Sequence, residues 1–117
     1  MEFEITFYKN SFGNSPVEEF LLKLSESNLK LVFKTREAID KLRNRVYHKE
    51  PFSKYLEPGL WELRIKSGTD ILRIFYTFQK GRIIILLQSF IKKKQKTPVK
   101  ELEIARKRLN ELRNIES

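Results

Sequence analysis

The chain has 117 residues, with 24 Lys or Arg against 15 Asp or Glu, so its formal net charge at neutral pH is +9. This length suits a single domain with one modest core, which we expect residues 1–117 to form, and a hydrophobic content of 40% excludes intrinsic disorder. The absence of cysteine excludes a disulfide scaffold, a thiol nucleophile and a cysteine-based zinc site.

The first half of the chain predicts a strand followed by a helical hairpin. Residues 3–8 alternate apolar and polar side chains, as a half-buried strand does. A Ser-Pro-x-Glu pattern beginning at Ser15 is typical of a capped helix start. Apolar residues at helical spacing continue to residue 46, with a break and a second cap at 25–28, so two helices are expected within 15–46.

The second half predicts an irregular segment, three strands and a helix. Two prolines exclude a regular helix from residues 48–59, which we expect to be irregular. Segments 60–66, 70–79 and 82–91, joined by tight glycine turns, predict an antiparallel three-strand meander. Apolar residues spaced by three and four predict a final helix after Thr97 and Pro98. The expected order is β-α-α-β-β-β-α, an α+β fold.

No part of the sequence predicts a membrane segment. The longest uncharged and mostly apolar run, Ile83 to Ile91, has nine residues, whereas a spanning helix needs about twenty. Glu2 and Glu4 lie where a secretion signal would be basic. We therefore expect a cytoplasmic protein with no membrane partner.

Positive charge is concentrated towards the C-terminus. Residues 92–117 hold nine basic and four acidic side chains. A run of lysines leads from the last predicted strand to the start of the final helix, where free backbone amides favour phosphate: Lys92, Lys93, Lys94 and Lys96. The run indicates either binding to a polyanion or a solvated connector.

Two arginines interrupt the predicted strands. Strand alternation puts Arg64 on the face of Glu62, and Arg73 on the face of Phe75. A guanidinium group there indicates a cleft that binds phosphate or an ion pair within the sheet, such as Glu62 with Arg73. Tyr76 faces away from Arg73, and both packing and function remain open for it.

Other common catalytic patterns are missing. The sequence contains one histidine, His48, and four glycines, and no pair of carboxylates has metal-ligand spacing. We therefore expect no Ser-His-Asp triad, no glycine-rich phosphate loop and no metal site.

Three segments carry a family pattern: KYLEPGLWELR at 54–64, RIFY at 73–76 and FIKKKQKTP at 90–98. In this order they resemble the HigB-like toxins of the RelE/ParE superfamily, which include phage-derived members. The resemblance covers nearly the whole chain. It implies a RelE-like fold and the toxin of a type II toxin–antitoxin pair.

The same resemblance implies ribosome-dependent cleavage of mRNA, without metal or cofactor, and neutralisation by a HigA-like helix-turn-helix antitoxin. In such ribonucleases the 2′-hydroxyl attacks the adjacent phosphate, while cationic groups stabilise the charge that develops. Two alternatives remain open. One is a non-enzymatic poison of DNA gyrase from the other branch of the superfamily, and the other is an inactive nucleic-acid-binding relative.

By position, the resemblance implies that Arg73 binds the scissile phosphate and that Lys92 and Lys93 act as acid or phosphate ligands. Arg64 and Glu62 fall where relatives place basic residues, one of them the general base. Arginine is a poor base because it stays protonated.

The general base is therefore left open between Glu62, a lysine such as Lys54, and solvent. Relatives also use an aromatic residue after the lysine run, and the final helix has no Tyr or Phe. Tyr76 or Tyr55 can substitute for it. The expected RNA-binding residues are Lys94, Lys96 and Tyr76.

Overall fold

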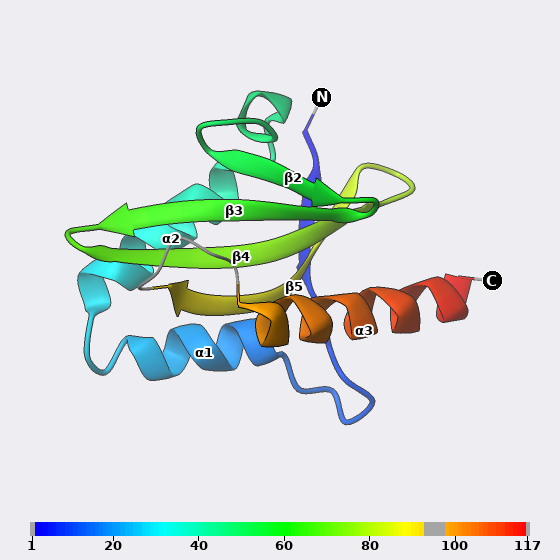
Figure 1. Ribbon diagram of the computed structural model, residues 1–117, viewed down its shortest axis with the longest axis horizontal. Coiled ribbons are helices and arrows are strands. Elements are labelled where there is room, and N and C mark those ends of the chain that lie inside the picture. The colour runs from blue at the N-terminus through cyan, green and yellow to red at the C-terminus, as the bar shows by residue number, and fades with distance from the viewer. Residues whose placement is uncertain (1, 93–97, 117) are drawn as a thin grey trace.

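The computed structural model describes residues 2–92 and 98–116 and has an α+β architecture. Its elements in chain order are β1 (Glu4–Phe7), α1 (Pro16–Leu24), α2 (Leu29–Lys41), the 3₁₀ turn η1 (Arg45–Tyr47), β2 (Ser53–Glu57), β3 (Leu60–Ser67), β4 (Asp70–Gln79), β5 (Ile83–Lys92) and α3 (Val99–Glu116). Helices α1 and α2 pack on one face of the sheet, and α3 packs on the other (Figure 1).

The sheet is mixed and has the strand order β1-β5-β4-β3-β2. The meander β3-β4-β5 is antiparallel, which confirms the expected strands and turns. Strand β1 lies parallel to β5, so the first strand of the chain pairs with the last. Within the described ranges, no helix is long and apolar enough to span a bilayer.

The expectation of an irregular segment at 48–59 is wrong for residues 53–57, which form β2. The expected order β-α-α-β-β-β-α therefore lacks one strand. Pro51 and Pro58 flank β2 without interrupting its pairing with β3, its one neighbour in the sheet. Gly59 completes the turn to β3 at φ +86°, a conformation that favours glycine.

The helix starts are set by side-chain caps, as the sequence predicts. The Ser15 hydroxyl accepts a hydrogen bond from the Glu18 backbone amide at 3.3 Å. The Asn28 side-chain oxygen accepts one from the Leu31 amide at 3.1 Å. Both caps satisfy amides that have no partner within their own helix.

The two faces of the sheet carry separate hydrophobic cores. The core under α1 and α2 includes Val17, Leu21, Leu31, Ile39, Leu63 and Ile74. The core under α3 includes Leu60, Phe75, Leu87, Phe90, Ala105 and Leu109. Strand β5 contributes to both cores, which explains why its sequence shows little alternation.

Strand β5 contains a β-bulge next to the middle of β4. Phe75 lies opposite Gln88 and Tyr76 lies opposite Leu86, so Leu87 is an extra residue on β5. An arginine of α3, Arg108, donates to the Leu87 carbonyl and to the Gln88 side-chain oxygen, each at 2.7 Å. The bulge therefore serves as an anchoring point for α3.

Further polar contacts fix the two ends of α3. Near its start, the Gln88 amide donates to Glu101 at 2.8 Å. Near its end, the Tyr8 hydroxyl donates to Glu111. Arg106 forms an exposed ion pair with Glu57 of β2 at 2.7 Å. These contacts hold α3 along one face of the sheet.

Candidate functional site

The sheet brings two arginines into direct opposition. Arg64 of β3 and Arg73 of β4 are cross-strand partners, so their side chains lie on the same face of the sheet. This face also carries Phe75 and Phe90 of the α3 core, with Phe90 opposite Arg73. The arginines therefore lie next to the hydrophobic surface that α3 covers.

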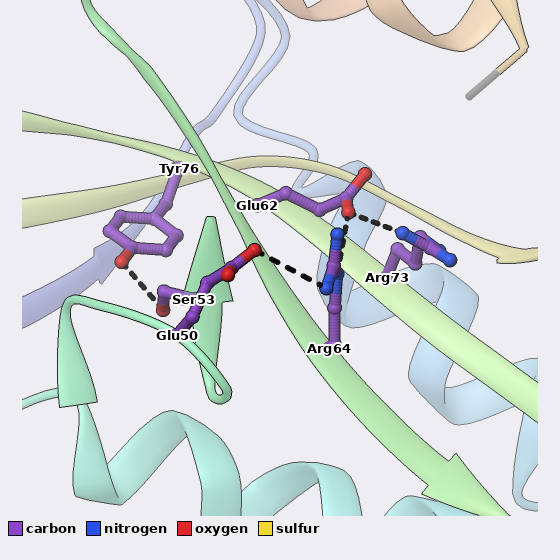
Figure 2. A network of polar contacts seen from close by, with 6 residues as sticks. All are labelled: Glu50, Ser53, Glu62, Arg64, Arg73 and Tyr76. Carbon is purple, nitrogen blue, oxygen red and sulfur yellow. Dashed lines mark hydrogen bonds and ion pairs between the residues drawn. The ribbon is translucent and has the colours of Figure 1, made fainter. Parts of the chain in front are cut away.

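A buried carboxylate lies between the arginines. Glu62 is 0% exposed. It accepts a hydrogen bond from Arg73 Nη1 and another from Arg64 Nε at 3.2 Å (Figure 2). Arg64 also reaches Glu50, with Nη1 to Oε1 at 3.8 Å (Figure 2). The ion pair between Glu62 and Arg73, one of the two alternatives drawn from the sequence, is thus present.

Arg73 keeps a donor that the described residues do not satisfy. The residue is 7% exposed, and its Nε is buried without a hydrogen-bond partner in residues 2–92 and 98–116. A buried donor that lacks a partner costs free energy, so such groups call for an explanation.

Two lysines complete the group of charges. Lys92, at the end of β5, is 3% exposed. Burial and then the positive charges of Arg73, Arg64 and Lys54 lower its pKa from the usual 10.5, although Glu62 partly opposes this shift. The lowered pKa makes the ammonium group a better proton donor near neutral pH.

Lys54 comes from β2, opposite Glu62 in the register of β2 and β3. Its neighbour Ser53 faces the core under α1 and α2, so Lys54 lies on the arginine face and is exposed. We name Lys54, Glu62, Arg64, Arg73 and Lys92 the cationic cluster. Its four cations exceed its one carboxylate, and the excess charge suits a polyanionic ligand.

The structure does not bring the two tyrosine candidates, Tyr76 and Tyr55, to the cationic cluster. Tyr76 is 0% exposed in the core under α1 and α2, where its hydroxyl donates to Ser53 Oγ at 2.8 Å (Figure 2). Burial raises the pKa of Tyr76 to about 12. A ring in this position has no surface on which a base can stack, so we leave Tyr76 out of the site.

The lysines that follow β5 belong to a segment outside the described ranges. Lys93, Lys94 and Lys96 lie outside the described residues, as does the expected cap Thr97. Tyr55 of β2 is 54% exposed and packs edge-on against Trp61. Within residues 2–92 and 98–116, no group of three or more His, Asp or Glu side chains is arranged to hold a metal ion.

Sequence reasoning missed the contribution of Glu50, which lies at the exposed edge of the cluster. It falls in the segment that was expected to be irregular, where alternation carries no information on side-chain direction. The five-residue pattern SKYLE at 53–57 was the available signal for β2 and hence for the side on which Lys54 lies.

Residues 19–110 match the family model described as "Phage derived protein Gp49-like (DUF891)". The chain belongs to this family. The Gp49-like family is a RelE/HigB-like toxin family of toxin–antitoxin systems and is associated with RelE-like endoribonuclease toxins. No curated protein shows a significant match to the chain.

The Gp49-like match includes every residue of the cationic cluster and the three helices that pack on the sheet, apart from residues 16–18 of α1 and 111–116 of α3. Membership implies an antitoxin partner.

Proposed function

We propose that this Gp49-like chain acts as a ribosome-dependent mRNA endoribonuclease, the toxin of a type II toxin–antitoxin pair. The observation that carries this proposal is the opposed pair Arg64 and Arg73 around buried Glu62, with Lys92 and Lys54 facing the same carboxylate. Four cations on one face suit the phosphates of RNA, and the family association with RelE-like endoribonucleases supports the reaction class.

The proposed reaction is an internal displacement at the phosphorus atom of the RNA backbone. The 2′-oxygen forms a bond to the adjacent phosphorus, the bond from phosphorus to the 5′-oxygen breaks, and a 2′,3′-cyclic phosphate remains. Arg64, whose side chain is 28% exposed, and Arg73 donate to the non-bridging oxygens, where negative charge increases in the transition state.

Two protons move in this reaction. The Lys92 ammonium gives one to the departing 5′-oxygen, a role that its lowered pKa favours. The proton of the 2′-hydroxyl passes to water, because Lys54, the exposed lysine of the cluster, has no lone pair to accept it while it is an ammonium. Glu62 holds the two arginines in place and is too buried to contact the 2′-hydroxyl.

We further propose that a HigA-like helix-turn-helix antitoxin silences the toxin in the cytoplasm. A cationic surface is blocked most directly by acidic side chains or by preventing access to the ribosome. The purified proteins should co-elute as a complex. Separate elution at micromolar concentration would contradict this partner.

The activity is tested by primer extension on a defined mRNA in a reconstituted translation system. We expect discrete breaks with the wild type, no breaks without ribosomes, and no breaks with Arg73→Ala. Arg36→Ala is the matched control, because Arg36 is an exposed arginine of α2 on the opposite face of the sheet. Intact mRNA with the folded wild type would contradict the proposal, and a gyrase inhibition assay would then test the main alternative.

A further inference from the structure

A second group of arginines surrounds a surface hollow elsewhere on the molecule. The hollow has a volume of about 430 Å³ and is lined by Arg43, Asn44, Arg45, Arg82 and Glu2. Its positive residues come from two distant segments, the end of α2 with η1 and the turn between β4 and β5. We name it the arginine hollow.

The arginine hollow is separate from the cationic cluster. Arg82 immediately precedes β5, whereas Lys92 is the last residue of that strand. Ten residues of strand at about 3.3 Å each put these two positions about 30 Å apart. No residue of the hollow belongs to the cluster, so the proposed reaction leaves the hollow without a role.

The fold holds two of the three arginines of the hollow in fixed positions. Arg82 has φ +62°, and its carbonyl accepts a hydrogen bond from the Glu4 amide at 2.8 Å. Its guanidinium group lies over the ring of Phe3, 5.5 Å from the centroid. Arg43 Nε donates to Asp40 at 2.9 Å. Two of the three arginines are thus ordered before any ligand binds, which lowers the entropic cost of binding.

The lining of the hollow favours phosphate over a protein surface. Three guanidinium groups face one carboxylate in the lining, that of Glu2, with Asp40 beside Arg43. None of the lining residues is apolar, whereas a stable protein interface has an apolar centre. Guanidinium groups bind phosphate oxygens through pairs of parallel hydrogen bonds.

We propose that the arginine hollow binds phosphate groups of ribosomal RNA and seats the toxin on the ribosome. This inference rests on the proposed function, because a ribosome-dependent nuclease needs contacts with the ribosome that differ from those with the mRNA. Two cationic sites about 30 Å apart on one sheet let the hollow bind ribosomal RNA while the cationic cluster remains open to mRNA.

The test measures binding to purified ribosomes without mRNA, by co-sedimentation at several salt concentrations. The test variant is Arg45→Gln/Arg82→Gln. The control, Lys34→Gln/Arg36→Gln, removes the same charge from exposed positions of α2. A charge-preserving variant, Arg45→Lys/Arg82→Lys, separates loss of charge from loss of fold.

We expect the test variant to bind ribosomes at least about tenfold more weakly at 0.1 M salt, with a shallower salt dependence by about one to two in log–log slope. The control and the lysine variant should bind like the wild type or close to it. Wild-type binding by the test variant, or an equal loss in the control, would overturn the proposal. So would loss of antitoxin binding with ribosome binding unchanged.

Failure of the docking proposal is distinguishable from failure of the proposed function. Arg73→Ala should retain ribosome binding, because Arg73 lies outside the hollow. If the wild type binds ribosomes through the hollow but leaves mRNA intact, the nuclease proposal fails and the docking site stands. If mRNA is cleaved equally well by the test variant and the wild type at limiting toxin, the docking site fails and the nuclease proposal stands.

Discussion

Arg64 and Arg73 lie directly opposite each other on adjacent strands, and both donate to the single buried carboxylate of Glu62. Like charges in this position destabilise a pair of strands. Glu62 offsets the repulsion and holds both guanidinium groups on one side of the sheet. The cluster is therefore a network in which each member changes the free energy of the others.

The network predicts non-additive stability changes. Arg73→Gln leaves buried Glu62 with fewer donors, so we expect the free energy of unfolding to fall by about 1–3 kcal/mol. Adding Glu62→Gln should recover part of this loss, because the uncompensated charge is removed. Urea denaturation of the wild type, both single variants and the double variant measures the coupling. Strictly additive changes would show that the two residues do not act together.

Cleavage activity should separate the roles of Glu62 and Arg73. Glu62→Gln keeps a side-chain oxygen that can accept from the arginines, so we expect the single-turnover cleavage rate to stay within about tenfold of the wild type. Arg73→Ala should lower it by about 100-fold or more, as loss of a transition-state donor does. A Glu62→Gln loss as large as that of Arg73→Ala would instead make Glu62 the general base.

The pH dependence of cleavage should report Lys92. Burial and the charges of Arg73, Arg64 and Lys54 lower its pKa, and Glu62 partly raises it. If the ammonium form is the proton donor, the cleavage rate falls as pH rises through this lowered pKa, at a lower pH than an ordinary lysine would require. Single-turnover rates on preformed ribosome complexes measure the profile, and Lys92→Arg should remove the alkaline fall. A rate that rises over the same range would identify Lys92 as the base.

Tyr76→Phe should reduce stability and leave cleavage unchanged. The substitution removes the hydrogen bond to Ser53 and leaves a buried hydroxyl without this partner, at a cost of about 1–2 kcal/mol. Thermal denaturation and the primer-extension assay measure the two effects. A selective loss of cleavage at unchanged melting temperature would return Tyr76 to the RNA-binding residues.

Gly59 should tolerate substitution less well than Gly81, although both have nearly the same φ, +86° and +83°. A Cβ at Gly59 would lie 2.5 Å from Arg113 Nη2 and 2.9 Å from Leu109 Cδ2, whereas one at Gly81 would meet nothing within 4 Å. We expect Gly81→Ala to cost about 1 kcal/mol and Gly59→Ala about 2–3 kcal/mol. Equal shifts in melting temperature would mean that α3 does not press on this turn.

Local sequence patterns were sufficient for most elements of the fold. The strands β3, β4 and β5 follow from alternation and glycine turns, and the caps Ser15 and Asn28 set the helix starts. Strand β2 was not predicted, because it has only five residues between two prolines and pairs with a single neighbouring strand, β3. The parallel pairing of β1 with β5 joins Glu4 to Ile83, a contact that local sequence cannot specify.

The sequence predicts which face of a strand each site residue lies on, because side chains alternate along the strand. It does not predict which residues lie opposite each other on neighbouring strands. Alternation put Glu62 and Arg64 on one face and Arg73 on the face of Phe75. The opposition of Arg64 and Arg73 follows from the length of the β3–β4 turn, and the position of Lys54 follows from pairing with an unexpected strand. The arginine hollow joins segments about 40 residues apart, so no local sequence pattern predicts it.

The single extra residue at Leu87 decides which side of the protein Lys92 reaches. Ile84 and Leu86 face the core under α1 and α2, and strict alternation would send Lys92 to that same side. The bulge shifts the alternation of side chains by one residue. Phe90 therefore packs under α3, and Lys92 lies with the other cations of the cluster. Deletion of one residue between Leu86 and Lys92 would bury a lysine in an apolar core and remove one positive charge from the cationic cluster. Substitutions along this stretch leave each side chain on its own face of the sheet, whereas the insertion or deletion of a single residue moves the side chains beyond it to the opposite face.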